Sequence, residues 1–294
     1  MKKKKIDPKD IVIGALAVFV LLEAYLLLSQ TPKEIVVVKK IAQPAVAAPQ
    51  QKPQAISLKP IVPKPIVGRV AIIIDDCGYN LLPCEFSEKI KAPVTFSVLP
   101  GLQHSTDAAE CAHQQNKEVM LHLPMEPHHN DDKYPQDYIL TTAMPKSKVV
   151  KIIDEALKTV PHAQGVNNHM GSKATENKPL MTTVFSTLKK KGFFFVDSLV
   201  TEKSICQNLA ASFELPFSER TIFLDNQNER DYIEGQFAQL AQIARKKGFA
   251  IAIGHARRLT LEVIKEQTEA LSQEGIEFVT VHNIISKENE YLGH

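Results

Sequence analysis

Two adjacent carboxylates stand out as a group that could do chemistry. Asp75 and Asp76 end the apolar run of AIIIDDCG, residues 71–78. Two like charges side by side are unfavourable unless a metal ion or a cationic side chain lies beside them. The alternative is a turn after a strand, because Asp-x-Gly segments commonly form turns. This stretch alone slightly favours the turn, so the choice depends on what later strands bring to the same place.

Further polar residues stand at the ends of later apolar runs. His122 and Asp197 end such runs, and His169 and His255 follow directly after them. In a parallel α/β barrel every strand delivers its carboxyl end to one face, where sites are built. A single histidine of this kind would be typical of a structural residue. So many positions in succession favour a shared site.

These residue types suit a hydrolytic metal centre. One aspartate and two histidines with an open fourth position are a usual zinc ligand set. A bound divalent metal lowers the pKa of its water, so hydroxide is available near neutral pH. A second carboxylate could act as general base and a histidine across the pocket as general acid. The set suits hydrolysis of an amide or ester, and it would equally suit a phosphoesterase.

The elements that must position these residues alternate between helices and short apolar strands. Three helical patterns end in basic or polar residues and a glycine, at Gly192, Gly248 and Gly275. Glycine there suits the left-handed residue that closes a helix. We predict strands at residues 70–74, 94–99, 118–122, 164–168, 193–197, 249–254 and 277–281, with one more near 213–215 or 221–224. Seven or eight strands alternating with helices indicate an α/β domain with a parallel sheet, open or closed.

The amino-terminal region has the pattern of a membrane anchor. Residues 1–10 are rich in lysine, and residues 11–29 are almost entirely apolar and long enough to span a bilayer as a helix. No small-x-small cleavage site follows. We therefore expect a cytoplasmic tail (1–10), a single-pass signal anchor in a bacterial inner membrane (11–29) and a Pro/Lys/Ala-rich linker (30–68). The folded domain, 69–294, would lie on the periplasmic side.

Composition adds two limits on the class of protein. Hydrophobic residues make up 44% of the 294 residues and the formal net charge is +2, so nothing marks a nucleic-acid binder. Cys77, Cys84, Cys111 and Cys206 show no CxxC spacing, which argues against a structural zinc knuckle. A disulfide is permitted outside the cytoplasm, but the sequence assigns no pairing.

Six motifs in order resemble the divergent polysaccharide deacetylase family. They are IIIDDCG, TFSVLP, KEVMLHLPMEP, GVNNHMGS, FFFVDS and AIGHAR, and they run across roughly residues 69–285. The resemblance implies that the folded domain is a distorted parallel (β/α) barrel. It also implies that the protein removes acetyl groups from a glycan. It also implies a divalent metal as cofactor, with zinc expected.

The resemblance assigns the main roles residue by residue. Asp75 matches the family's catalytic base and Asp76 its metal ligand. His122 aligns with the first histidine of the usual ligand pair, but the second position is Glu126. Either Glu126 is itself a ligand or His169 completes the metal site from the next strand. We expect His169, because a His, His, Asp set keeps the ligand field of zinc, which leaves Glu126 to contact the substrate or support the ligands.

Supporting roles fall to four further residues. His255 resembles the histidine that protonates the leaving amine, and Asp197 would orient it or hold a substrate hydroxyl. Asn168 would shape a turn or bind sugar hydroxyls. Arg257 would hold an acetate-like carboxylate, pair with the acid or form a surface salt bridge.

Three hypotheses of function follow. The leading one is a membrane-anchored, metal-dependent deacetylase of peptidoglycan or another envelope polysaccharide, with envelope proteins as possible partners. The second is a non-catalytic glycan-binding or scaffold protein, motivated by Glu126 in place of the usual histidine. The third is a metal-dependent phosphoesterase.

Overall fold

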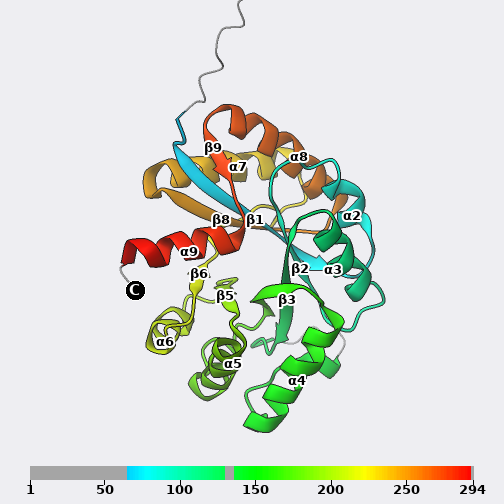
Figure 1. The fold of residues 1–294 in the computed structure, drawn as a ribbon, viewed down its shortest axis with the longest axis vertical. Coiled ribbons are helices and arrows are strands. Elements are labelled where there is room, and N and C mark those ends of the chain that lie inside the picture. Colours follow the sequence, from blue (N-terminus) through cyan, green and yellow to red (C-terminus); the bar gives the residue numbers. More distant parts are fainter. Residues whose placement is uncertain (1–64, 130–135, 293–294) are drawn as a thin grey trace, which may run out of the picture. The chain divides into compact units, whose positions relative to one another are not determined.

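The computed structural model describes residues 65–129 and 136–292 (Figure 1). The expected tail, the expected anchor and nearly all of the expected linker lie outside the described residues. Within the described part of the chain, no helix is long and apolar enough to cross a membrane.

Strands and helices alternate along the described chain, as the glycine-punctuated pattern predicted. The strands are β1 (Gly68–Cys77), β2 (Thr95–Val98), β3 (Glu118–Met125), β4 (Ala163–Met170), β5 (Phe194–Asp197), β6 (Phe217–Glu219), β7 (Ile222–Phe223), β8 (Phe249–His255) and β9 (Ile276–Phe278). The helices are α2 (Leu82–Ser87), α3 (Ser105–Gln114), α4 (Lys146–Thr159), α5 (Lys178–Lys191), α6 (Cys206–Phe213), α7 (Arg230–Lys247), α8 (Arg258–Gln273) and α9 (Val281–Leu292), with a 3₁₀ turn η1 (Gln136–Tyr138).

The strands form one parallel sheet in the order β6-β5-β4-β3-β2-β1-β8-β7, and β9 pairs with the start of β1. Figure 1 shows the strands at the centre with α2 to α8 arranged around them. The predicted parallel (β/α) architecture is confirmed. Among the described residues β6 and β7 do not pair with each other, so the curved sheet stays open between them. Of the two alternatives for the further strand, 221–224 is confirmed by β7, and 213–215 is wrong, because α6 runs to Phe213 and β6 begins only at Phe217.

Two apolar layers hold the sheet. The outer layer lies between the strands and the surrounding helices, and it includes Ile72 and Ile74 of β1. The inner layer includes the alternate residues Ala71 and Ile73, together with Ile284 of α9. Strand residues of alternating number point to opposite faces, so β1 is buried on both sides and its continuous apolar run is explained.

Helix α9 closes the end of the barrel opposite to the polar strand ends. Its first backbone amides, Val281 N and His282 N, donate to the carboxylate of Glu118 at 2.9 and 3.0 Å. Thr95 Oγ1 donates to the same carboxylate at 2.6 Å. Because Glu118 is the first residue of β3, α9 lies at the amino ends of the strands. The carboxyl ends are thereby left for the site.

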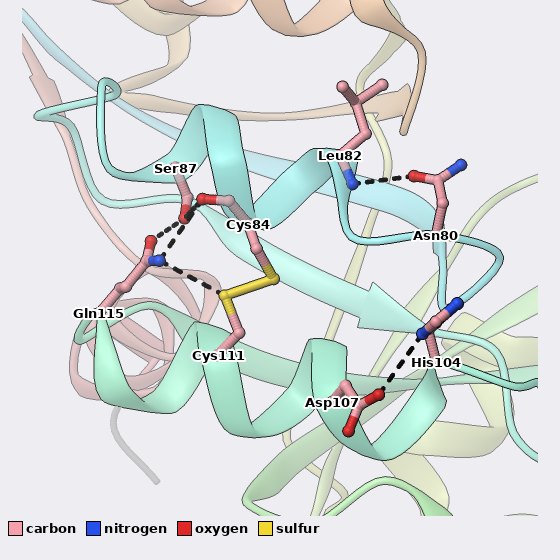
Figure 2. The surroundings of a disulfide bond; sticks show 8 residues. All are labelled: Asn80, Leu82, Cys84, Ser87, His104, Asp107, Cys111 and Gln115. Atoms are coloured by element: carbon pink, nitrogen blue, oxygen red, sulfur yellow. Dashed lines mark hydrogen bonds and ion pairs between the residues drawn. A yellow bond between two sulfur atoms is a disulfide. The ribbon is translucent and has the colours of Figure 1, made fainter. Parts of the chain in front are cut away.

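A disulfide joins α2 to α3 through Cys84 and Cys111, whose Cα atoms are 6.1 Å apart (Figure 2). The side chain of Gln115 donates to Cys84 O at 3.4 Å and lies next to Ser87. Twenty-seven positions separate the two cysteines along the sequence, and only the packing of the two helices brings them together. Cys77 and Cys206 are free and buried.

Candidate active site

The end of β1 is bent so that both carboxylates reach one point. Consecutive strand residues normally point to opposite faces. Here the β1–β2 register shifts between Ile74 and Cys77, and Asp76 adopts a left-handed φ of 59°. Asp75 Oδ2 and Asp76 Oδ1 consequently lie 3.5 and 3.3 Å from His122 Nε2. A strained residue in a strand bulge is a recurrent way of re-aiming a side chain at a functional site.

Asp76, His122 and His169 form a compact three-atom cluster. Asp76 Oδ1 lies 3.3 Å from His122 Nε2 and 3.1 Å from His169 Nδ1, and the two ring nitrogens are 3.1 Å apart. Ligand atoms bound to one zinc-like ion at about 2.1 Å, with angles near 90–110°, lie about 3.0–3.4 Å from one another. Asp76 Oδ1 is buried and accepts no hydrogen bond of normal geometry from any described residue. The cluster therefore fits a single divalent ion, and it unites the three residues predicted as ligands.

Asn167 connects this cluster to Asp75. Its Oδ1 lies 2.8 Å from His122 Nδ1, and its amide nitrogen donates to Asp75 Oδ1 at 2.9 Å. Because a carboxylate needs a donor, the amide nitrogen faces Asp75 and the amide oxygen faces His122. His122 Nδ1 then carries the proton, which leaves the Nε2 lone pair directed at the cluster. We did not expect Asn167 to contact a metal ligand, although its position two residues before His169 in GVNNHMGS was a usable signal.

The charges of the cluster suit a cation. Burial alone would raise the pKa of Asp76, yet the close polar contacts and charge of His122 and His169 hold that pKa well below its usual range. Burial also disfavours the charged form of His122, but Asp75 and Asp76 raise its pKa above the ordinary value. Burial dominates at His169 and lowers its pKa. The two carboxylates thus stabilise a positive charge at their centre, and the second imidazole stays neutral as a metal ligand must be.

His255 ends β8 and is held by Asp225. Its Nδ1 lies 2.8 Å from Asp225 Oδ1, and its backbone amide donates to Asp225 Oδ2 at 3.0 Å. Thr260 Oγ1 donates to that oxygen at 2.7 Å, and Asp225 is fully buried. Burial would lower the pKa of His255, but the hydrogen bond and charge of Asp225 raise it. Sequence reasoning missed Asp225, although it follows the predicted strand 221–224 just as the other site residues follow theirs.

The structure gives Asp197 a different set of contacts from those we expected. Asp197 Oδ1 accepts from Leu199 N at 2.8 Å and Oδ2 accepts from Ser204 Oγ at 2.5 Å. Of the two roles that we weighed for Asp197, orienting His255 is corrected, because Asp225 makes that hydrogen bond, and holding a substrate hydroxyl stays a prediction. Asp197 instead braces the loop between β5 and α6.

The side chains of Glu126 and Asn168 make hydrogen bonds to neighbouring residues and not to the cluster. Glu126 accepts from Lys173 Nζ at 2.6 Å and from the amide and hydroxyl of Thr142 at 2.6 and 2.8 Å, and it is not part of the cluster. Asn168 Oδ1 accepts from Ser198 N at 2.8 Å, and its amide nitrogen donates to a backbone carbonyl two residues later. Both side chains shape the loops above the site.

Arg257 lies beside the hydrogen-bonded pair of His255 and Asp225. Its Nη1 donates to Asp225 O at 3.1 Å and lies 3.7 Å from Asp225 Oδ2, while about half of its side chain is exposed. Of the three roles that we weighed for Arg257, this geometry matches pairing with the His255–Asp225 pair.

Comparisons with known proteins agree with the motif pattern. The family model described as divergent polysaccharide deacetylase matches residues 72–285. The uncharacterized protein YibQ of Escherichia coli K12 is 35% identical over 205 residues, which cover 68% of this chain and 62% of that protein. The chain thus spans less than two thirds of YibQ. An uncharacterized protein of Haemophilus influenzae is 32% identical over 217 residues, covering 74% of this chain and 76% of its own length.

A solved structure shares the fold. The crystal structure of the uncharacterized protein ATU2773 from Agrobacterium tumefaciens C58 superposes with a TM-score of 0.70 at 21% identity, covering 74% of this chain and 89% of that one. Because the family model covers most of the chain, including every residue of the cluster, the chain belongs to the divergent polysaccharide deacetylase family.

Proposed function

We propose that this protein is a metal-dependent hydrolase that removes acetyl groups from a glycan of the bacterial cell envelope, with zinc as the metal. The observation that carries the proposal is the three-atom cluster of Asp76, His122 and His169 beside Asp75. When bound there, a divalent ion would supply a water of lowered pKa and polarise the acetyl carbonyl.

We assign Asp75 the role of general base. It is buried, and Asn167 holds its Oδ1 at 2.9 Å while its Oδ2 faces the cluster. A fixed carboxylate oxygen near the ligands can take a proton from the attacking water.

We assign His255 the role of general acid. Asp225 occupies its Nδ1, so Nε2 is the atom that can carry a proton to the leaving nitrogen or oxygen. Because Asp225 raises the pKa of His255, the imidazole keeps its proton to a higher pH than a free histidine.

We also propose that the chain is anchored in the inner membrane with its folded domain in the periplasm. The lysine-rich start and the apolar residues 11–29 support the anchor. The Cys84–Cys111 disulfide supports an oxidising compartment, since such bonds are rare in the cytosol.

The test uses the full chain, purified in detergent, with peptidoglycan and N-acetylglucosamine oligomers as substrates. We expect about one zinc per chain by elemental analysis, acetate release that stops on chelation, and no release by Asp75→Asn. Absence of bound metal together with unchanged behaviour on chelation would refute the proposal.

A non-catalytic glycan-binding protein remains the second candidate. It is favoured by Glu126, which stands at a usual ligand position but is held by Lys173 and Thr142. Glycan binding that survives Asp75→Asn, with no acetate released by the wild type, would select it. Release of phosphate from phosphate esters would instead select the phosphoesterase.

A further inference from the structure

The open side of the barrel is bridged by two residues, Arg220 and Thr221, which connect β6 to β7. Arg220 N donates to Asp197 O in β5 at 2.9 Å, whereas Thr221 N donates to Ile251 O in β8 at 2.7 Å. The chain therefore steps from one edge of the sheet to the other at this point. A hollow of ≈ 930 Å³ runs along the seam, lined among others by Leu199 and Arg220. Hydrogen bonds across this hollow therefore contribute to holding its two edges.

The side chain of Arg220 makes such a connection. Its Nε donates to Ser198 O at 2.7 Å and its Nη2 donates to Leu199 O at 2.9 Å, both in the loop after β5. The guanidinium carbon also lies 3.9 Å from the ring centroid of Phe223 in β7. Leu199 has a left-handed φ of 48°, a conformation that needs such support. One planar group thus binds both edges of the seam, which a guanidinium can do and an ammonium cannot.

Each end of this connection leads to a catalytic group. Phe223 lies nearly parallel to the ring of His255, with centroids 6.1 Å apart and planes 13° apart. On the other side, Ser198 Oγ lies 3.4 Å from the amide nitrogen of Asn167, which holds Asp75. Arg220 is therefore connected through Phe223 to His255, the proposed acid, and through Ser198 and Asn167 to Asp75, the proposed base.

We propose that Arg220 is a positioning residue that fixes His255 relative to Asp75 by tying the loop after β5 to Phe223. The expected effect of Arg220 on kcat rests on the proposed hydrolase function. The effect of Arg220 on the placement of His255 can be measured without turnover. Arg220 does not touch the reacting atoms, and its side-chain hydrogen bonds go to the loop after β5 and not to Asp76, His122 or His169.

The test compares Arg220→Lys and Phe223→Leu with the wild type in the full chain. Lysine keeps the charge but loses the fork of hydrogen bonds and the flat stacking surface. We expect kcat for acetate release to fall about tenfold to a hundredfold, as for a misplaced catalytic group. KM and zinc content should stay at wild-type values.

A second measurement follows the ring signals of His255 by NMR, assigned with His255→Gln. The charged groups that act on His255 are Asp225, Asp75 and Asp76, and both variants keep all three. We expect the chemical shifts and the pH midpoint of His255 to change in both variants. The matched control is Arg245→Lys, which alters an exposed ion pair with Glu274 and should change nothing.

The proposal is overturned if kcat and the His255 signals of both variants equal those of the wild type, or if both variants lose their zinc. If the wild type releases no acetate, the proposed function fails but the NMR comparison still decides the positioning role. If Arg220→Lys does not fold, Phe223→Leu decides alone, since it removes the ring and leaves the two hydrogen bonds of Arg220.

Discussion

Replacing Asn167 with alanine removes the side chain that orients His122 and holds Asp75. The fully buried amide makes a 2.8 Å contact with His122 Nδ1 and a 2.9 Å hydrogen bond to Asp75 Oδ1. A buried polar group that loses its partner costs about 1–3 kcal/mol, so the loss of a partner by both His122 and Asp75 should lower the free energy of unfolding by about 2–6 kcal/mol. Loss of the group that orients a metal-bound histidine typically weakens metal binding about 10–100-fold, or about 1.4–2.8 kcal/mol.

The neighbouring variant Asn168→Ala is the matched control. Asn168 is equally buried, but its amide bonds backbone groups of Ser198 and Met170. We expect it to lower the free energy of unfolding by about 1–3 kcal/mol and to leave zinc affinity unchanged. Urea unfolding of the metal-free protein gives the first quantity and titration calorimetry with zinc gives the second.

Two results would refute this reasoning. If Asn167→Ala binds zinc as tightly as the wild type, His122 is oriented by another group. If Asn168→Ala loses as much zinc affinity as Asn167→Ala, the effect comes from general loosening of β4.

Three further predictions concern the acid pair, the metal ligands and the disulfide. Asp225→Asn removes the charge that raises the pKa of His255, so the alkaline limb of the kcat profile should move to lower pH; an unmoved limb would exclude His255 as the acid. His169→Ala should abolish stoichiometric zinc, as measured by elemental analysis, whereas His128→Ala, an exposed histidine paired with Glu176, should keep it. Cys84→Ser should lower the unfolding free energy by about 3.5 kcal/mol, the loop-entropy estimate for a 27-residue separation, and reductant should have the same effect on the wild type but none on the variant.

Features encoded in short stretches could be predicted from the sequence. The apolar run before Asp75 predicted β1, and Gly192 and Gly248 marked helix ends, where both adopt left-handed φ values of 72° and 89°. Placing polar residues at the carboxyl ends of parallel strands also brought the predicted ligands together, because strand direction alone sends those ends to one face.

Which carboxylate holds His255 was decided by the tertiary structure. Asp197 and Asp225 both follow short strands, and their sequence contexts are alike. The sheet order puts β7 directly beside β8, so Asp225 meets His255, while β5 lies on the far side of the open seam.

The sequence by itself therefore determined the strand pattern, which follows from local periodicity, and the resemblance of its motifs to the family assigned Asp76, His122 and His169 as the expected ligands. The bend that turns Asp76 toward His122, the pairing of Cys84 with Cys111 and the capping of α9 by Glu118 required the tertiary structure. Each of these depends on contacts between residues far apart in the chain, or on a register shift between strands, and neither leaves a local pattern in the sequence.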